Sequence, residues 1–271
     1  MEEKNRSMNM NKTMTMMKTN RIFFWMLGCI AVLSALQGLQ AQTPGLSYPV
    51  PLDEAHFPDE MFREYLMGRY INGDNIDKNG DGQLSVEECG DVTAVGLKIE
   101  NGLTYVTLTG VSSLKGIEYF YALDSLGFYD SFVTSLDVSR NTALTCLVCW
   151  GNELTSLDLS RNTALTYLYC ASNQLTSLDV SKNTALTYLE CYGNQLTSLD
   201  VSGCAALTDL DCYGNQLTSL DVSGCAALTT LRCYANQLTS LDVSKNTALT
   251  TLRCYANQLT SLDVSKNTAL T

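Results

Sequence analysis

The chain has 271 residues and a formal net charge of −11. An acidic chain is repelled by nucleic acid and by anionic membranes, so both are excluded as partners. There is a single histidine, His56, although most metal-dependent and triad-type catalysis relies on histidine. We therefore expect a binding or structural protein rather than an enzyme.

Residues 1–41 have the features of a secretory signal peptide. Lys18 and Arg21 precede an apolar run over 22–36, and Ala41 offers a small residue for cleavage. The apolar run is short for a membrane span, and nothing later is apolar enough to cross a bilayer. A membrane anchor or a lipoprotein is the alternative. We favour cleavage after Ala41, which predicts a secreted or cell-surface protein with a net charge of −14 and no membrane span.

A proline-rich stretch and a short helix follow the signal. All four prolines lie between positions 44 and 58, which predicts an exposed linker over 42–57. Phe62, Tyr65 and Leu66 are spaced as on one face of a helix, so the pattern predicts an amphipathic helix over 58–70.

The stretch 77–88 fits the 12-residue calcium loop of an EF-hand. Gly82 permits the sharp turn, and Glu88 would supply a bidentate carboxylate. The alternative is an acidic Asn/Gly loop with no ion. We predict calcium as a cofactor that braces the start of the next domain, bound at Asp77, Asn79, Asp81, Gln83 (through its carbonyl), Ser85 (through water) and Glu88.

Residues 123–271 consist of a 21-residue unit that recurs almost unchanged. Leucine, cysteine and asparagine each recur at this interval, for example at Leu165, Cys170 and Asn173. A fixed period of this length predicts a solenoid, in which each unit buries its apolar face against its neighbours. Both halves of the unit read Leu-Thr-x-Leu-x-apolar-x-x-Asn. We therefore predict a flattened coil with two parallel β-ladders, each closed by an Asn turn.

The pattern Leu-x-x-Leu-x-Cys-x-x-Asn-x-Leu resembles the leucine-rich repeat, and more narrowly the bacterial internalin-like repeats that carry a cysteine ladder. The segments 57–65 and 113–120, with the calcium loop between them, resemble the cap that precedes such repeats. The resemblance implies a mainly β, right-handed solenoid with a parallel sheet on its concave face, used for binding. Residues 58–122 would form the cap and degenerate first repeats.

The repeated cysteines lie at the inward position of a predicted strand, where free cysteine acts as a small hydrophobic residue. In-register neighbours have parallel Cβ vectors, which does not suit a disulfide. We interpret Cys149 to Cys254 as reduced core thiols. Cys204 and Cys225 replace asparagine in adjacent units, and we favour a second short ladder over a disulfide between them.

Outward positions of the predicted concave sheet carry aromatic and charged residues, which are frequent at interfaces. Stacking of tyrosine copies within the sheet is an equally weighted explanation. The function is then either binding of a protein or glycan, as an adhesin does, or that of a spacer or a targeting part of a larger secreted enzyme. The candidate partner-binding residues are Trp150, Tyr169, Glu190, Tyr192, Asp211, Tyr213, Arg232, Tyr234, Arg253 and Tyr255.

The sequence stops at Thr271, inside a repeat unit. An open solenoid end would expose core and an unpaired strand edge, which natural repeat proteins cover with a capping unit. We therefore expect the sequence to be part of a longer product.

Overall fold

The computed structural model describes residues 46–69, 76–100, 103–106 and 108–271. The predicted signal peptide over 1–41 lies outside the described residues, as do Tyr70 and the turn at Asn72 and Gly73. Within the described ranges, no helix is long and apolar enough to cross a membrane.

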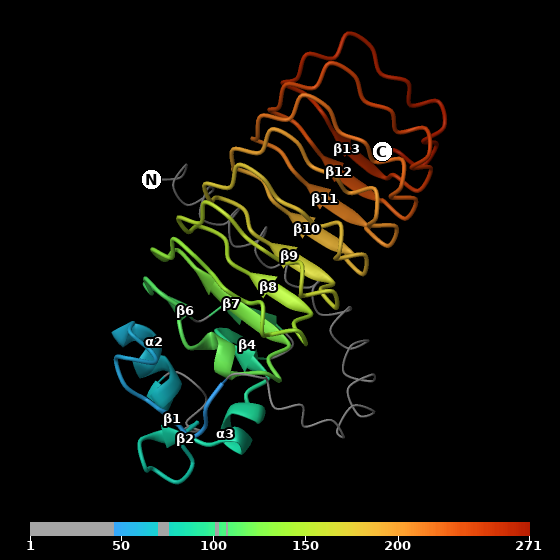
Figure 1. Ribbon diagram of the computed structural model, residues 1–271. Coiled ribbons are helices and arrows are strands. Elements are labelled where there is room, and N and C mark those ends of the chain that lie inside the picture. The colour runs from blue at the N-terminus through green and yellow to red at the C-terminus, as the bar shows by residue number, and fades with distance from the viewer. Residues whose placement is uncertain (1–45, 70–75, 101–102, 107) are drawn as a thin grey trace, which may run out of the picture.

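The N-terminal part is a small cap in which short helices alternate with short strands (Figure 1). Asp59 begins the first helix, because its carboxylate accepts a hydrogen bond from the Phe62 N–H at 2.8 Å. The second carboxylate oxygen accepts bonds from Ser112 and Ser113 and so ties this helix to the first coils. The cap elements are β1 (Val50–Pro51), α2 (Glu60–Glu64), the π-helical η2 (Tyr65–Arg69), β2 (Gln83–Leu84) and α3 (Val86–Gly90).

The helix over 58–70 therefore exists as α2 continued by η2, with Phe62, Tyr65 and Leu66 buried as the spacing predicted. Residues in the expected linker take part in the cap. Val50 is buried and β1 pairs antiparallel with β2, while the ring of Phe57 is fully buried. Pro51 did not prevent the formation of β1, because a two-residue edge strand tolerates proline.

Short strands connect the cap to the repeats. β4 and β5 pair antiparallel, whereas β3 and β6 pair parallel with β7 (Ser125–Tyr129) and begin the solenoid sheet. Phe128 on β7 is fully buried at the position that cysteine occupies in later units. The connecting elements are β3 (Ala94–Val95), β4 (Leu97–Glu100), β5 (Leu103–Val106), β6 (Leu108–Thr109) and the 3₁₀ turn η3 (Ile117–Tyr119).

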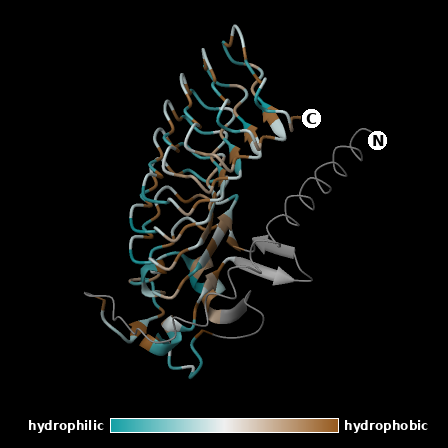
Figure 2. Ribbon diagram, turned by 90° about the vertical axis from the view of Figure 1, so that its right-hand side faces the viewer, coloured by the Kyte–Doolittle hydropathy of each residue, from teal (hydrophilic) through white to brown (hydrophobic). Residues whose placement is uncertain are grey.

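The repeats form about seven stacked coils, each of which contributes one strand to a parallel sheet (Figure 1). Each residue pairs with the one 21 positions later, as Leu168 does with Leu189. In profile, the coils form a curved stack (Figure 2). The strands are β7 (Ser125–Tyr129), β8 (Cys146–Val148), β9 (Tyr167–Tyr169), β10 (Tyr188–Glu190), β11 (Asp209–Asp211), β12 (Thr230–Arg232) and β13 (Thr251–Arg253).

The predicted second β-ladder is wrong in its extent. The second half of each unit shows only isolated bridges, from Asp179 to Asp200 and from Asp200 to Asp221. The physical reason is the curvature of the stack. Sheet hydrogen bonds hold the coils at about 4.8 Å on the inner face, so the outer segments fan apart and cannot keep a continuous ladder.

The predicted asparagine turns also differ in detail. The left-handed backbone belongs to the residue before the asparagine, such as Ser172, Gly193 or Ala235. The asparagine itself is buried and satisfies backbone groups of two coils. Asn194 donates to the carbonyls of Cys170 and Cys191 at 3.1 Å, and its side-chain oxygen accepts the Leu175 N–H at 3.0 Å.

Candidate functional site

The loop over 77–88 is organised around the carboxylate of Asp77, which is buried. One oxygen accepts the Gly80 N–H at 2.7 Å and the Asp81 N–H at 3.2 Å, and the other accepts the Gly82 N–H at 2.8 Å. Gly80 and Gly82 both have positive φ, so the chain turns sharply around this carboxylate.

The predicted ligands at the other end of the loop come from its exit helix. Ser85 caps α3, and the carboxylate of Glu88 accepts the Lys78 N–H and the Ser85 N–H, both at 2.8 Å. These bonds connect the two ends of the loop. The hydrogen bond from the Ser85 N–H is the largest influence that lowers the pKa of Glu88, so the carboxylate is charged at neutral pH.

The loop over 77–88 contains a short strand, β2, and another strand of the cap, β1, pairs with it. β2 pairs with β1 through Leu84 and Val50, and the Leu52 N–H donates to the Gly82 carbonyl at 3.0 Å. Leu84 is fully buried. The loop is therefore fixed to the segment that was expected to be a linker.

The donor set of the loop is all oxygen, which suits a hard cation such as Ca²⁺. Asn79 and Asp81 are exposed, and their side-chain oxygens accept the N–H groups of Asp81 and Gln83. Each carboxylate oxygen retains a second lone pair after one such bond. Across the described residues, no group of three or more His, Cys, Asp or Glu side chains meets the geometry of a metal site. The loop would depend on its amide, carbonyl and hydroxyl donors as well.

The concave sheet carries a continuous row of aromatic rings, which we call the aromatic ribbon. Successive ring centroids lie 4.3 to 6.0 Å apart, and the interplanar angles between the last four rings are 8° to 10°. Parallel in-register strands place equivalent side chains one above the other, which explains this stacking. The aromatic ribbon consists of Tyr129, Trp150, Tyr169, Tyr192, Tyr213, Tyr234 and Tyr255.

Tyr169 belongs to the neighbouring column of the sheet, yet it keeps the ribbon continuous. Its own coil has Ala171 where the other coils have a ring, and Tyr169 fills the gap. Its hydroxyl lies 2.6 Å from the Tyr192 hydroxyl. A second stacked pair, Tyr167 and Tyr188, lies beside the ribbon with a centroid distance of 4.4 Å.

The predicted charged residues lie deeper than the sequence indicated. Glu190 is 1% exposed and Asp211 is 3% exposed, whereas Arg253 is exposed. Asp211 accepts two hydrogen bonds from one guanidinium nitrogen of Arg232, at 2.7 and 2.9 Å. Glu190 accepts a hydrogen bond from the hydroxyl of Tyr188. Asp211 and Arg232 therefore form an ion pair that is largely shielded from solvent.

Burial and these carboxylates shift the pKa values of Arg232 and Tyr169 on this face. Burial acts to lower the pKa of Arg232, but the charges of Asp211 and Glu190 outweigh it and raise the pKa. Burial, followed by the charge of Glu190, raises the pKa of Tyr169 well above its usual range. The Tyr169 hydroxyl therefore stays protonated at neutral pH and acts as a neutral group.

Sequence reasoning overlooked four outward residues of this face: Tyr129, Tyr167, Tyr188 and Asp209. Tyr129 lies one period of 21 residues before Trp150, so the repeat itself could have identified it. Tyr188 and Asp209 also lie at outward positions of β10 and β11. Their packing against Glu190 and Thr208 depends on side-chain directions that the sequence pattern does not give.

The repeated cysteines lie directly beneath this face. All ten cysteines among the described residues are free thiols, and Cys149, Cys170, Cys191, Cys212 and Cys233 are fully buried. Cys204 and Cys225 replace asparagines whose side-chain oxygens make no hydrogen bond in the other coils. These positions therefore need only a hydrogen-bond donor. At Cys225 the thiol is that donor, and it lies 3.3 Å from the Val201 carbonyl oxygen.

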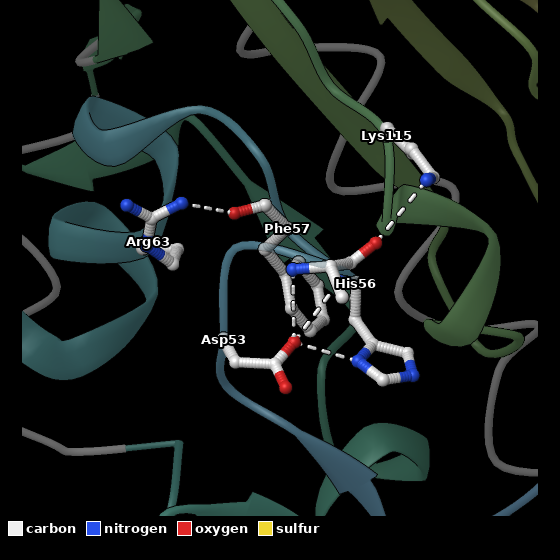
Figure 3. Close-up of polar contacts among 6 residues, drawn as sticks. Asp53, His56, Phe57, Arg63 and Lys115 are labelled. Atoms are coloured by element: carbon white, nitrogen blue, oxygen red, sulfur yellow. Dashed lines mark hydrogen bonds and ion pairs between the residues drawn. The ribbon is translucent and has the colours of Figure 1, made fainter.

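His56 lies in the cap, where Figure 3 shows its local contacts. Its Nδ1 is 2.7 Å from a carboxylate oxygen of Asp53, three residues earlier, and this contact lowers the pKa of Asp53. Arg63 donates to the Phe57 carbonyl and Lys115 to the Ala55 carbonyl. These bonds fix the loop before α2 against the first coils, which is a structural role.

No protein-family model matches the chain, and no curated protein matches it. Among solved structures, the functional domain of InlJ from Listeria monocytogenes, described as including a cysteine ladder, matches with a TM-score of 0.70 at 37% identity. This match covers 82% of the chain and 46% of the InlJ structure, so the chain spans about half of that structure's length.

Two further structures are similar in fold. Internalin C2 from Listeria monocytogenes matches with a TM-score of 0.67 at 22% identity, over 83% of this chain and 95% of that one. A leucine-rich repeat protein of Leptospira interrogans matches with a TM-score of 0.55 at 25% identity, over 60% and 45%. With its 21-residue coils, parallel sheet and buried cysteine column, the chain is an internalin-like leucine-rich repeat protein.

Proposed function

We propose that this protein is exported and binds a macromolecular partner, a protein or a glycan, on the concave face of its solenoid. The partner would meet the aromatic ribbon and the neighbouring residues of β9 to β13. Export would follow cleavage of the signal over 1–41 and would place the protein in the medium or on the cell surface, as an adhesin. Binding, without catalysis, would be its whole activity.

The aromatic ribbon is the observation that carries this proposal. Tyrosine and tryptophan are enriched at interfaces because they bury a large area with little loss of side-chain entropy. The rings of Trp150, Tyr192, Tyr213 and Tyr234 are only partly buried, and Tyr255 is 62% exposed. A partner that covered them would remove a long apolar strip from water.

A spacer without a ligand is the second candidate, and the same stacking favours it. Each ring covers its neighbours, so the ribbon stabilises the sheet whether or not a partner binds. The two candidates differ in one respect: only the binding function requires the exposed ring edges.

We also propose that the loop over 77–88 binds calcium in the exported protein. The all-oxygen donor set, the turn at Gly82 and the support from β1 favour this site. The ion would neutralise the gathered carboxylates of Asp77 and Glu88 and hold the cap against the first coils.

Attachment of the full chain to immobilised matrix proteins, glycans and whole cells tests the binding function. The test variant combines Tyr213→Thr and Tyr234→Thr, which removes two adjacent rings of the aromatic ribbon just past the ends of β11 and β12. The matched control combines Gln216→Thr and Gln237→Thr, which lie in the same coils on an exposed row outside the ribbon.

Binding predicts that attachment falls about tenfold or more in the tyrosine variant and stays within about twofold in the glutamine variant. Both variants must retain a cooperative unfolding transition. If the chain attaches to nothing, or if both variants attach as well as the wild type, the spacer function is correct instead.

A further inference from the structure

The aromatic ribbon holds neighbouring tyrosine rings face to face. Tyr213 lies between Tyr192 and Tyr234 at centroid distances of 4.3 Å, with interplanar angles of 8° and 9°. The coils of Tyr213 and Tyr234 pair in parallel register, and the Gly214 N–H donates to the Tyr234 carbonyl at 3.1 Å, so this register continues past the strand ends. Equivalent ring atoms of adjacent coils therefore lie opposite each other, including the carbons beside the two hydroxyl groups.

The cap contains a tyrosine pair with the opposite geometry. The rings of Tyr48 and Tyr119 have centroids 6.1 Å apart and an interplanar angle of 79°, so the edge of one ring points at the other. The Tyr48 hydroxyl donates to the Tyr119 carbonyl at 3.0 Å, which fixes this arrangement. A perpendicular pair does not bring the carbons beside both hydroxyl groups together. The same protein thus offers a stacked pair and a perpendicular pair for comparison.

Tyr213 and Tyr234 are also accessible to a reagent in solution. Both residues are partly exposed although both faces of each ring are covered, so the exposure is at the ring edges. Burial raises the pKa of both hydroxyl groups, which therefore carry their protons at neutral pH. The thiols that precede them in the chain, Cys212 and Cys233, are fully buried, and a buried thiol reacts poorly with an oxidant.

We propose that Tyr213 and Tyr234 form a site of oxidative modification, at which hydrogen peroxide and a haem peroxidase join the two rings by a carbon–carbon bond. Each hydroxyl group loses one hydrogen atom, as a proton and an electron, and the peroxide takes up both and becomes two molecules of water. The two phenoxyl radicals couple through the ring carbons beside their oxygens. The hydrogen atoms on these carbons move to the oxygens, which restores both hydroxyl groups.

Proximity favours this reaction over its competitors. A radical on an isolated tyrosine meets a second radical only by diffusion, whereas the aromatic ribbon holds the second phenol in contact. The product would tie together two coils whose tyrosines are 21 positions apart in the sequence. This inference does not rest on the proposed binding function, because it requires only the stacked rings and the oxidant.

Peroxidase treatment of the full chain at low concentration tests the proposal. The monomer is isolated in denaturant and digested with trypsin. Cleavage after Lys182, Arg232 and Lys245 places Tyr213 and Tyr234 in separate peptides, 183–232 and 233–245. We predict dityrosine fluorescence in the monomer, and a peptide whose mass is the sum of these two less two hydrogen atoms. Photo-oxidised ruthenium tris-bipyridine with persulfate is used in parallel, so that the size of the peroxidase does not decide the result.

Phenylalanine variants assign the bond. Tyr213→Phe and Tyr234→Phe each keep a stacked ring but remove the hydroxyl group from which the radical forms. Each should lower the yield of the linked peptide about tenfold or more, because no other tyrosine of 183–232 stacks on Tyr234. The variant at Tyr234 is needed because 254–266 repeats the sequence of 233–245. The control is Tyr119→Phe, which removes one tyrosine from the cap and should leave the yield within about twofold.

All variants must retain the unfolding transition of the wild type. The proposal is overturned if neither oxidant gives the linked peptide in the monomer, or if the link occurs only in covalent dimers. Persistence of the linked peptide in both ribbon variants would also overturn it. An equal yield of a link between Tyr48 and Tyr119 would show that coupling does not depend on stacking, with the same consequence.

Discussion

The buried asparagines show how single residues hold the coils together. Asn194 makes bonds to backbone groups of its own coil and of the coil before it, so it replaces turn hydrogen bonds that the backbone alone cannot form. The residue before this asparagine, Gly193 in this coil, adopts the left-handed backbone conformation of the turn. That residue is glycine in three coils, but Ser172, Ala235 and Ala256 adopt the same conformation with a side chain.

This arrangement predicts that Ala235→Gly stabilises the protein by about 0.5 to 1 kcal/mol. Ala235 has φ of 53°, where a Cβ atom is strained, and Gly193 and Gly214 occupy the equivalent positions without strain. Urea unfolding followed by circular dichroism measures the change. Ala248→Gly is the control, since Ala248 is exposed and lacks positive φ; it should destabilise the protein by a similar amount. A loss of stability in Ala235→Gly would contradict the account.

The buried cysteines predict a loss of stability at alkaline pH. Burial raises the pKa of Cys170 and of Cys233 from about 9 to about 12. The unfolded chain releases these protons near pH 9 and the folded chain holds them, so the stabilisation is complete below pH 9 and is lost as the pH rises toward 12.

Unfolding of the reduced protein at pH 8 and pH 10 measures this effect. Cys170→Ala removes one such thiol, and the drop in unfolding free energy between the two pH values should become smaller by about 1 kcal/mol. Tyrosine ionisation contributes equally to both proteins and cancels in the comparison. An identical drop in both would show that the thiol titrates as in the unfolded chain.

At the scale of elements, the proposed calcium loop over 77–88 depends on pieces that lie far apart in the sequence. β1 supports β2, and Asp59 links α2 to Ser112 and Ser113. Ion binding at the loop, which we propose, would thereby be connected to the first coils of the solenoid. Since a lone extracellular site has an affinity of about 10⁻⁴ to 10⁻³ M, the ion would act as a structural brace.

We predict that calcium at ten times its dissociation constant stabilises the wild type by about 1.4 kcal/mol. Glu88→Gln should abolish this gain, because it replaces the carboxylate that joins the two ends of the loop. The control is Glu87→Gln, an exposed neighbour in the same first turn of α3, which should retain the gain. Thermal unfolding with calcium and with EGTA gives the comparison. Equal gains in both variants would place the ion elsewhere.

The elements also show what the sequence could and could not predict. The 21-residue period determined the sheet, its register and the buried leucine and cysteine columns, because equivalent residues of a parallel stack must coincide. The isolated bridges on the outer side were not predictable from the period, since they result from curvature. The exposure of Glu190 and Asp211 was also misjudged. Alternation along a strand predicts only the face on which a side chain lies, and not its bonds to neighbours such as Tyr188 and Arg232.

The cap was harder to predict than the repeats because it lacks internal copies. The helix near position 60 and the loop over 77–88 were visible as local patterns. The pairing of Val50 with Leu84 was not, because it joins segments that are distant in sequence and is only two residues long.

At the scale of the whole molecule, the seven repeat strands form one continuous sheet (Figure 1). The stacked rings of the aromatic ribbon follow the same succession of coils. Its rigidity comes from coils that repeat the same contacts, so little order has to be gained on binding. This surface carries partly exposed rings, whereas the outer side carries exposed aspartates in turns with Ser181, Ser202 and Ser223.

Hydroxyl-radical footprinting of the full chain, free and attached to a surface that binds it, tests the central claim most directly. Oxidation is read by mass spectrometry at each residue. The account predicts protection of Tyr192, Tyr234 and Tyr255 on attachment, with unchanged oxidation of Met61 and Met67, which are exposed on the cap. Protection of the cap methionines with unchanged tyrosines would show that the concave face is not the binding surface.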